Sequence, residues 1–227
     1  GGSVIINTAV DLTDDIAIIT DGSSTDGNIT FVDTVSGSYL LTLTAGNGAL
    51  EFDSTVNVAS IDALLTTGTT TAKANITTTG LQTYGGVLSL ATALAGTVTF
   101  TSANFTVAEN VISATTENTG IKIVSTGTVS FSGTNIGTAS NTLRDFEVTT
   151  DTAFTLSKPV LTTGAVTIQS QALSTLTSTI ETTTGDVTLG ATSPYIGTFN
   201  LSGDITTTVG GSVIINTAVD LTDDIAI

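Results

Sequence analysis

The sequence predicts an all-β chain that winds as a right-handed parallel β-helix, that is, a β-solenoid. Three observations lead to this fold class: the residue composition, a short glycine-led phrase that returns along the chain, and a long repeat at the two ends. Hydrophobic residues make up 40% of the chain. They are mainly Val, Ile, Leu and Ala, and with the abundant Thr they suit a pleated, half-buried strand. Parallel crossovers favour right-handed winding.

The returning phrase is Gly, any residue, an aliphatic residue, any residue, and then Ile, Leu or Phe. Its alternation of apolar and other residues is the period of a strand with one buried face. Its Gly permits a tight corner before each strand. We therefore expect a strand at each occurrence: Gly2–Ile6, Gly27–Phe31, Gly48–Phe52, Gly86–Leu90, Gly96–Phe100, Gly127–Phe131, Gly164–Ile168, Gly185–Leu189 and Gly211–Ile215.

The spacing of the phrase predicts the size of one coil. The steps from Gly2 to Gly27 and from Gly27 to Gly48 are about 20–26 residues long, which suits one solenoid turn. Longer steps elsewhere fit double or enlarged coils. Gly86 and Gly96 lie too close together for a full turn, so these two phrases are expected to be two strands of one turn. We expect roughly 8–10 coils per repeat, which advance roughly 40–48 Å along the axis.

A second Thr-rich element often precedes the corner, as in Val160–Gly164 and Ile180–Gly185. It predicts another short strand in each coil, with Thr facing outward to water. Several Phe residues fall on the buried phase of their strands or connectors and are expected to fill the core: Phe31, Phe52, Phe100, Phe131 and Phe146.

The stretch 131–160 is the least regular part of the sequence. It contains Arg144, Lys158 and Pro159, and Pro159 is expected at a corner or at the start of a strand because it cannot donate to a ladder. We expect Asn141–Phe146 to form a short protruding loop that serves as a plain connector.

The opening segment Gly1–Ile18 returns unchanged at the end of the chain as Gly210–Ile227. This identity predicts a tandem array. Residues 1–209 are interpreted as one repeat unit and residues 210–227 as the start of the next identical unit. Neighbouring identical repeats, stacked end to end, are then the expected partners.

Composition argues against several function classes. The net charge is −16, from 20 acidic and four basic residues, so nucleic acid is not expected as a partner. His and Cys are both absent, which removes the usual catalytic base and thiol nucleophile. No apolar run is long enough to predict a membrane span. We therefore expect no catalytic residues and no enzyme, and the scattered basic residues (Lys73, Lys122, Arg144 and Lys158) do not suggest a substrate groove.

No cofactor-binding residue is expected, and calcium is kept as an open alternative. Hard cations bind carboxylate and carbonyl oxygens, but the spacing here lacks the order of a known calcium loop. Asp and Gly also populate turns for conformational reasons alone. The candidate ligands are five aspartates near the amino terminus: Asp11, Asp14, Asp15, Asp21 and Asp26.

Two pieces of the chain carry a family resemblance. Ile76–Leu90 resembles the T-T-G-x-Q-x-Y-x-G-x-V-x-L phrase of the filamentous-haemagglutinin-like, β-strand-repeat giant bacterial exoproteins, and Ile136–Leu143 is similar to their G-x-A-x-x-x-L connector. The resemblance implies a right-handed β-helix in a very large secreted or cell-surface protein used in adhesion, matrix or surface coating. It supplies no catalytic residues.

Three functions remain open at this level. The first is a structural extracellular fibre, stalk or surface-layer repeat, with lateral self-association as a further option. The second is the shaft of a secreted bacterial adhesin that binds cell-surface glycans weakly and multivalently. The third is a polysaccharide-active β-helix enzyme. The rival fold is a string of antiparallel β-sandwich domains, two per repeat unit.

Overall fold

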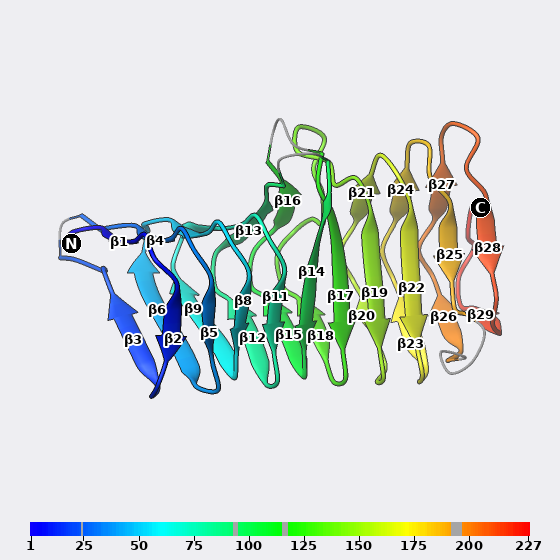
Figure 1. The fold of residues 1–227 in the computed structure, drawn as a ribbon. Coiled ribbons are helices and arrows are strands. Elements are labelled where there is room, and N and C mark those ends of the chain that lie inside the picture. Colours follow the sequence, from blue (N-terminus) through cyan, green and yellow to red (C-terminus); the bar gives the residue numbers. More distant parts are fainter. Residues whose placement is uncertain (24, 93–94, 115–117, 192–196) are drawn as a thin grey trace.

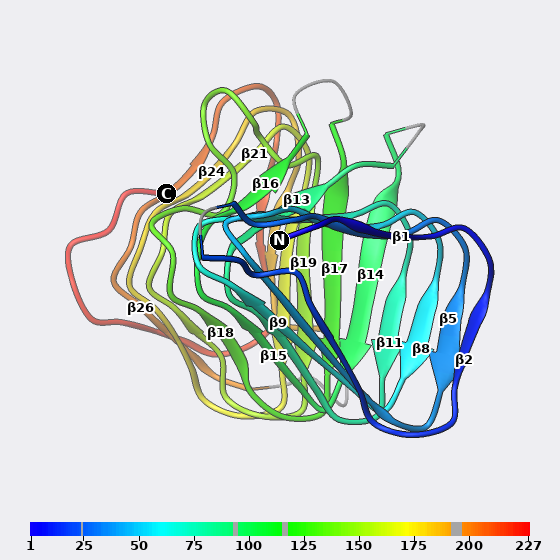
Figure 2. The same ribbon diagram turned by 90° about the vertical axis from the view of Figure 1, so that its left-hand side faces the viewer.

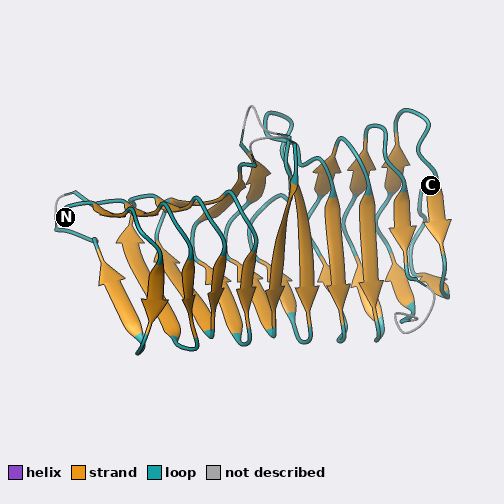
Figure 3. Cartoon of the chain, in the orientation of Figure 1, coloured by secondary structure: helices purple, strands orange, loops and turns teal. Residues whose placement is uncertain are grey.

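A computed structural model describes residues 1–23, 25–92, 95–114, 118–191 and 197–227. Over these ranges the chain forms 29 strands and no helix, and it winds through about nine turns of a parallel β-solenoid (Figures 1 and 3). Most turns lay one strand on each of three faces. The predicted all-β solenoid is confirmed, including its expected number of coils.

The first face begins as a sheet of six strands. Single parallel bridges from Val111 to Ile136 and from Ile136 to Val160 connect it to three further strands. Its strands are β1 (Val4–Ile6), β4 (Ile29–Phe31), β7 (Leu50–Phe52), β10 (Thr69–Ala72), β13 (Val87–Leu90), β16 (Val111–Ser113), β21 (Val160–Thr162), β24 (Ile180–Thr182) and β27 (Ile205–Thr207).

The second face is one continuous sheet of ten strands, which lie side by side along the coil (Figure 2). They are β2 (Val10–Leu12), β5 (Val35–Gly37), β8 (Val56–Val58), β11 (Ile76–Thr78), β14 (Thr97–Ser102), β17 (Gly120–Ser125), β19 (Phe146–Thr150), β22 (Val166–Ser170), β25 (Val187–Leu189) and β28 (Val213–Ile215).

The third face consists of a six-stranded sheet followed along the axis by a four-stranded one. Its strands are β3 (Ile16–Ile19), β6 (Leu40–Gly46), β9 (Ser60–Leu65), β12 (Leu81–Tyr84), β15 (Asn104–Val107), β18 (Val129–Phe131), β20 (Thr155–Leu156), β23 (Ser174–Leu176), β26 (Phe199–Leu201) and β29 (Val219–Leu221).

Neighbouring turns pair in parallel and keep equivalent residues in register. On the first face, for example, Val4 pairs with Ile29 and Ile29 pairs with Leu50. On the second face, Val148 pairs with Ile168. Inward side chains therefore stack on their equivalents from turn to turn. The antiparallel β-sandwich alternative is wrong, because the pairings between the strands of the described chain are parallel.

The core confirms the predicted aromatic positions. Phe31 and Phe52 stack with ring centroids 5.5 Å apart, and Phe100, Phe131 and Phe146 are also buried. Phe105, Phe154 and Tyr84 are buried as well, which the sequence reasoning missed. The Tyr84 hydroxyl donates to Gln82 Oε1, and the amide of Gln82 donates to the carbonyls of Ile76 and Thr101. Burial raises the pKa of the Tyr84 phenol.

The expectation that the Thr residues of the second element face outward is wrong at several positions. Thr78, Thr162 and Thr182 are buried at strand ends. The hydroxyls of Thr162 and Thr182 donate to the carbonyls of Gly164 and Gly185, at 2.8 and 2.7 Å. A buried hydroxyl costs stability only when it lacks a partner, and here the corner carbonyl supplies that partner.

Glycines stack on glycines at two corners of the coil. The first glycine ladder lies where the third face turns into the first and consists of Gly2, Gly27, Gly48, Gly68 and Gly86. The second glycine ladder lies where the first face turns into the second and consists of Gly164, Gly185 and Gly211. A Cβ at Gly48 or at Gly211 would lie within 3.0 Å of the backbone of the preceding ladder glycine, so these corners require glycine.

The short interval between Gly86 and Gly96 does contain two strands of one turn, as predicted. Gly86 precedes β13 on the first face and Gly96 precedes β14 on the second. The glycine-led phrase thus moves from one face to the next at this point in the chain. In the turns after Gly96, the backbone N–H of Gly120 donates to the Gly96 carbonyl, and that of Gly164 donates to the Arg144 carbonyl. Both bonds lie at the corner where the first face turns into the second.

The irregular stretch is more ordered than the predicted loop. Leu143 is fully buried and forms a parallel bridge to Thr162, and Phe146 starts β19. Of the expected loop Asn141–Phe146, only its first residues belong to a tight turn, closed by hydrogen bonds between Thr138 and Asn141. The protruding-loop prediction is therefore wrong, because apolar side chains anchor the segment in the core. Pro159 lies directly before β21, as expected.

Candidate functional sites

Two of the five candidate calcium ligands meet at one corner. The Oδ1 of Asp26 accepts from Gly22 N at 2.9 Å and its Oδ2 accepts from Asn47 N at 2.7 Å. These backbone hydrogen bonds hold the pKa of Asp26 below its ordinary value, and the Asp21 side chain adds to the effect. The corner borders an open hollow of about 410 Å³. The Asp26 carboxylate is thus occupied in fixing the turn.

The other three candidates lie apart from that corner and bond elsewhere. Asp11 accepts from the Ser36 hydroxyl, Asp14 from the backbone N–H of Asp15, and Asp15 from that of Leu40. Within the ranges that the structure describes, no three acidic side chains gather in the way a metal ion requires. The five aspartates do not form one site, and calcium binding stays an untested alternative.

Acidic and amide side chains at corners also connect successive turns, a role that the sequence reasoning missed. Each accepts a backbone N–H from the following turn, and the residue lies directly before a strand. An Asn or Asp directly before a predicted strand is the sequence signal that could have revealed this turn-connecting role. The pairs are Asn28 with Ala49, Asn75 with Thr99, Asp145 with Ala165, Asp186 with Ser212, and Asp204 with Ala226.

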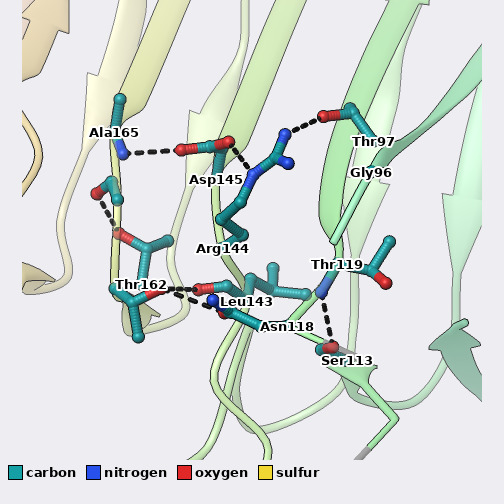
Figure 4. Close-up of polar contacts among 12 residues, drawn as sticks. Gly96, Thr97, Ser113, Asn118, Thr119, Leu143, Arg144, Asp145, Thr162 and Ala165 are labelled. Atoms are coloured by element: carbon teal, nitrogen blue, oxygen red, sulfur yellow. Dashed lines mark hydrogen bonds and ion pairs between the residues drawn. The ribbon is translucent and has the colours of Figure 1, made fainter. Parts of the chain in front are cut away.

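Arg144 and Asp145 form a connected polar cluster at the second corner, where the first face turns into the second (Figure 4). The Nε of Arg144 donates to Asp145 Oδ2 at 2.6 Å, and its Nη2 donates to Thr97 Oγ1 at 2.5 Å. Thr97 belongs to β14, two turns before Arg144. Gly120 lies on the turn between them, and a Cβ there would approach both Thr97 and Asp145 at 3.2 Å. The missing side chain leaves room for this two-turn contact.

The other paired basic residues also neutralise local acids. Lys73 lies 2.8 Å from Asp53 and 2.5 Å from Glu51, and Lys122 lies 2.6 Å from Glu147. The hydrogen bonds to Asp53 and Glu51 raise the pKa of Lys73. Lys73, Lys122 and Arg144 therefore lie on different turns, each beside a carboxylate. This arrangement offers no gathered positive charge for an acidic polymer.

The amino-terminal end of the coil is an open apolar mouth. It encloses about 230 Å³ and is lined mainly by first-turn side chains, among them Ile6, Val10, Leu12, Ile16 and Ile18, above Phe31 and Leu41. At the opposite end Leu221 and Ile227 remain exposed. Among the described residues, no further turn pairs with the outer backbone edges of these end turns, so both ends can accept a further strand layer.

Comparisons with known proteins find no matching family model, no matching curated protein and no matching solved structure. No helix in the described part of the chain is long and apolar enough to cross a membrane.

Proposed function

We propose that this chain is a repeat segment of a structural extracellular fibre, stalk or surface layer, in which units stack end to end into a long rod. One observation supports this most directly. The returning segment Gly210–Ile227 does not start a separate domain, because its strands β28 and β29 pair with β25 and β26 of the same solenoid. The start of the next unit thus continues the coil of the first.

The two ends supply a physical reason for stacking. An open solenoid end exposes unpaired backbone groups and the apolar side chains of its mouth, and another unit would cover both. Stability in such an array is a sum of coil terms and neighbour terms. The net charge of −16 would keep parallel rods apart in solution. The resemblance to filamentous-haemagglutinin-like exoproteins agrees with this role and with secretion, and both belong to the proposal.

Chains with one, two and three units test the proposal. Solution scattering and electron microscopy should show a rod that lengthens by roughly 45 Å per unit at constant cross-section. A maximum dimension that grows irregularly, as in separate domains joined by linkers, would contradict the stacked rod.

The single unit should self-associate through its ends at micromolar concentration. Replacing Ile6, which lines the mouth, with Asp should weaken that association in sedimentation experiments. Ile5→Asp is the matched control, because Ile5 is 62% exposed and does not line the mouth. Equal effects of the two variants, or a stable monomer of the unaltered unit, would count against end-to-end assembly.

A further inference from the structure

The two copies of the returning segment occupy different faces at the two ends of the chain. Val4–Ile6 lies on the first face and pairs with β4, whereas its copy Val213–Ile215 lies on the second face and pairs with β25. Val10–Leu12 lies on the second face and pairs with β5, whereas its copy Val219–Leu221 lies on the third face and pairs with β26.

The third part of the copy follows the same shift. Ile16 starts β3 on the third face. Its copy Ile225 adjoins the first face, where Ile205 N donates to the Ala226 carbonyl and Ala226 N donates to Asp204 Oδ1, each at 3.0 Å. All three parts of the repeat are therefore advanced by one face.

From these positions we propose that each repeat unit spans nine turns and one further face, so that successive units in the rod are rotated by one face. This inference rests on the proposed stacking of units. The count follows from the sheets: β28 is the tenth strand of a sheet whose first strand is β2, and β2 follows β1 by one face. Three units, not one, return a given residue to its starting face.

The glycine ladders explain why the shift persists. The first glycine ladder contains Gly2, and the second contains its copy Gly211. A Cβ on Gly211 would meet the Gly185 backbone, so the copy continues the second ladder without a break across the unit boundary. Within the unit the phrase leads first-face strands up to Gly86, the second-face strand β14 at Gly96, the third-face strand β18 at Gly127, and second-face strands from Gly164 onward. Every further unit would contain this net change of one face and thus advance by one more face.

The strands tolerate the change because they use the same inward pattern on either face. Val10 and its copy Val219 both pack against the core, and Asp11 and its copy Asp220 both point outward. A short strand with alternating apolar residues and a glycine corner fits any of the three faces. The corner contacts, not the strand itself, decide which face it takes.

The shift also identifies what fills the amino-terminal mouth in the rod. In the second copy, the equivalent residues lie against β25, β26 and β27, whose Leu189, Leu201 and Ile205 are buried. The occupant of the mouth is thus the carboxyl-terminal end of a preceding copy of this same unit. Strands β25, β26 and β27 of that copy cover the mouth, and the following unit is rotated by one face relative to it. The Arg144 corner of successive units would then point to three sides of the rod in turn.

Disulfide trapping tests the phase, because the chain contains no Cys of its own. Thr188 and Ile214 are in-register partners on neighbouring strands and both point outward. Their spacing of about 4.8 Å lies within the Cα separation that a disulfide bridges. In a two-unit chain, T188C/I214C should oxidise nearly completely. E181C/I214C is the matched control, since Glu181 points outward on the first face, the face that the first copy of this strand occupies.

The outcomes separate this inference from the proposed function. Oxidation of T188C/I214C and not of E181C/I214C, in a rod that lengthens per unit, supports both. A rod that lengthens while E181C/I214C oxidises overturns the rotation and leaves the stacked rod in place. A chain that does not lengthen with added units overturns the stacked rod itself, whichever cysteine pair forms.

Discussion

Gly1–Ile18 and Gly210–Ile227 have one sequence and two structural settings. The first copy forms the open amino-terminal end, with its first two strands on the first and second faces. The second copy packs on an earlier turn, and its equivalent strands lie on the second and third faces. Gly2 has no atom near the position of a Cβ, whereas at its copy Gly211 a Cβ would collide with the Gly185 backbone. The difference shows that the neighbouring turn, not the local sequence, assigns a strand to its face and makes its corner glycine indispensable.

The largest expected effect on stability comes from a comparison of two single variants, in which the same glycine is replaced either in the first copy or in the second. Gly211→Ala should lower the free energy of unfolding by about 1–3 kcal/mol, because the new methyl group meets backbone that must move. Gly2→Ala should change it by less than about 0.5 kcal/mol, as an exposed substitution does. Urea unfolding of the two variants measures the contrast. Equal losses would mean that Gly211 does not pack against the backbone of the Gly185 turn.

The buried threonines test whether the two corners are built alike. Thr20 Oγ1 donates to the Gly27 carbonyl at the first corner, and Thr182 Oγ1 donates to the Gly185 carbonyl at the second, both at 2.7 Å. Thr20→Val and Thr182→Val should each cost about 1 kcal/mol, since each leaves a carbonyl without its partner. Thermal unfolding measures both costs. If one variant were neutral and the other destabilising, the two corners would not be built alike.

An ion pair on the first half of the coil should contribute less. The bonds to Asp53 and Glu51 raise the pKa of Lys73, so its stabilisation is complete below its ordinary pKa and is lost as pH rises through the raised value. The side chain is 38% exposed, so Lys73→Gln should cost only about 0.2–1 kcal/mol at neutral pH. The cost should shrink in high salt and above about pH 11 in denaturant titrations. A cost that is unchanged by salt and pH would contradict an electrostatic origin.

The smallest effect is expected at the acidic corner of the first half. Because the pKa of Asp26 is lowered in the folded chain, its contribution is present above the ordinary value and is lost as pH falls through the lowered one. Asp26→Asn should therefore flatten the acid side of the stability profile below about pH 4, the ordinary range of an aspartate. Asp14→Asn, which removes an exposed carboxylate that accepts from the N–H of Asp15, is the control for the loss of one negative charge.

The sequence predicted the coil and its strands well because alternation and corner glycines are local signals. It did not predict the face of each strand, since Gly2–Ile6 reads identically on either face. The short interval between Gly86 and Gly96 marked the place of the shift, but its meaning depends on which earlier turn each glycine meets. The outward orientation assigned to Thr162 failed because its hydroxyl finds a partner only once the corner is formed.

The candidate sites show the same limit. Asp21 and Asp26 could be placed together because they share one turn. The contact of Arg144 with Thr97 crosses two turns and needs the bare backbone of Gly120, which no spacing within the sequence reveals. The turn-connecting role of Asp145 and Asp186 likewise becomes visible only when the following turn is in place.

The most direct test of the account is an electron cryomicroscopy reconstruction of an array of at least four units. The account predicts continuous parallel strands about 4.8 Å apart, with the Arg144 corner moving to the next side of the rod at every unit and returning after three. A reconstruction in which each unit presents that corner on the same side, or in which the strands stop at the unit boundary, would contradict it.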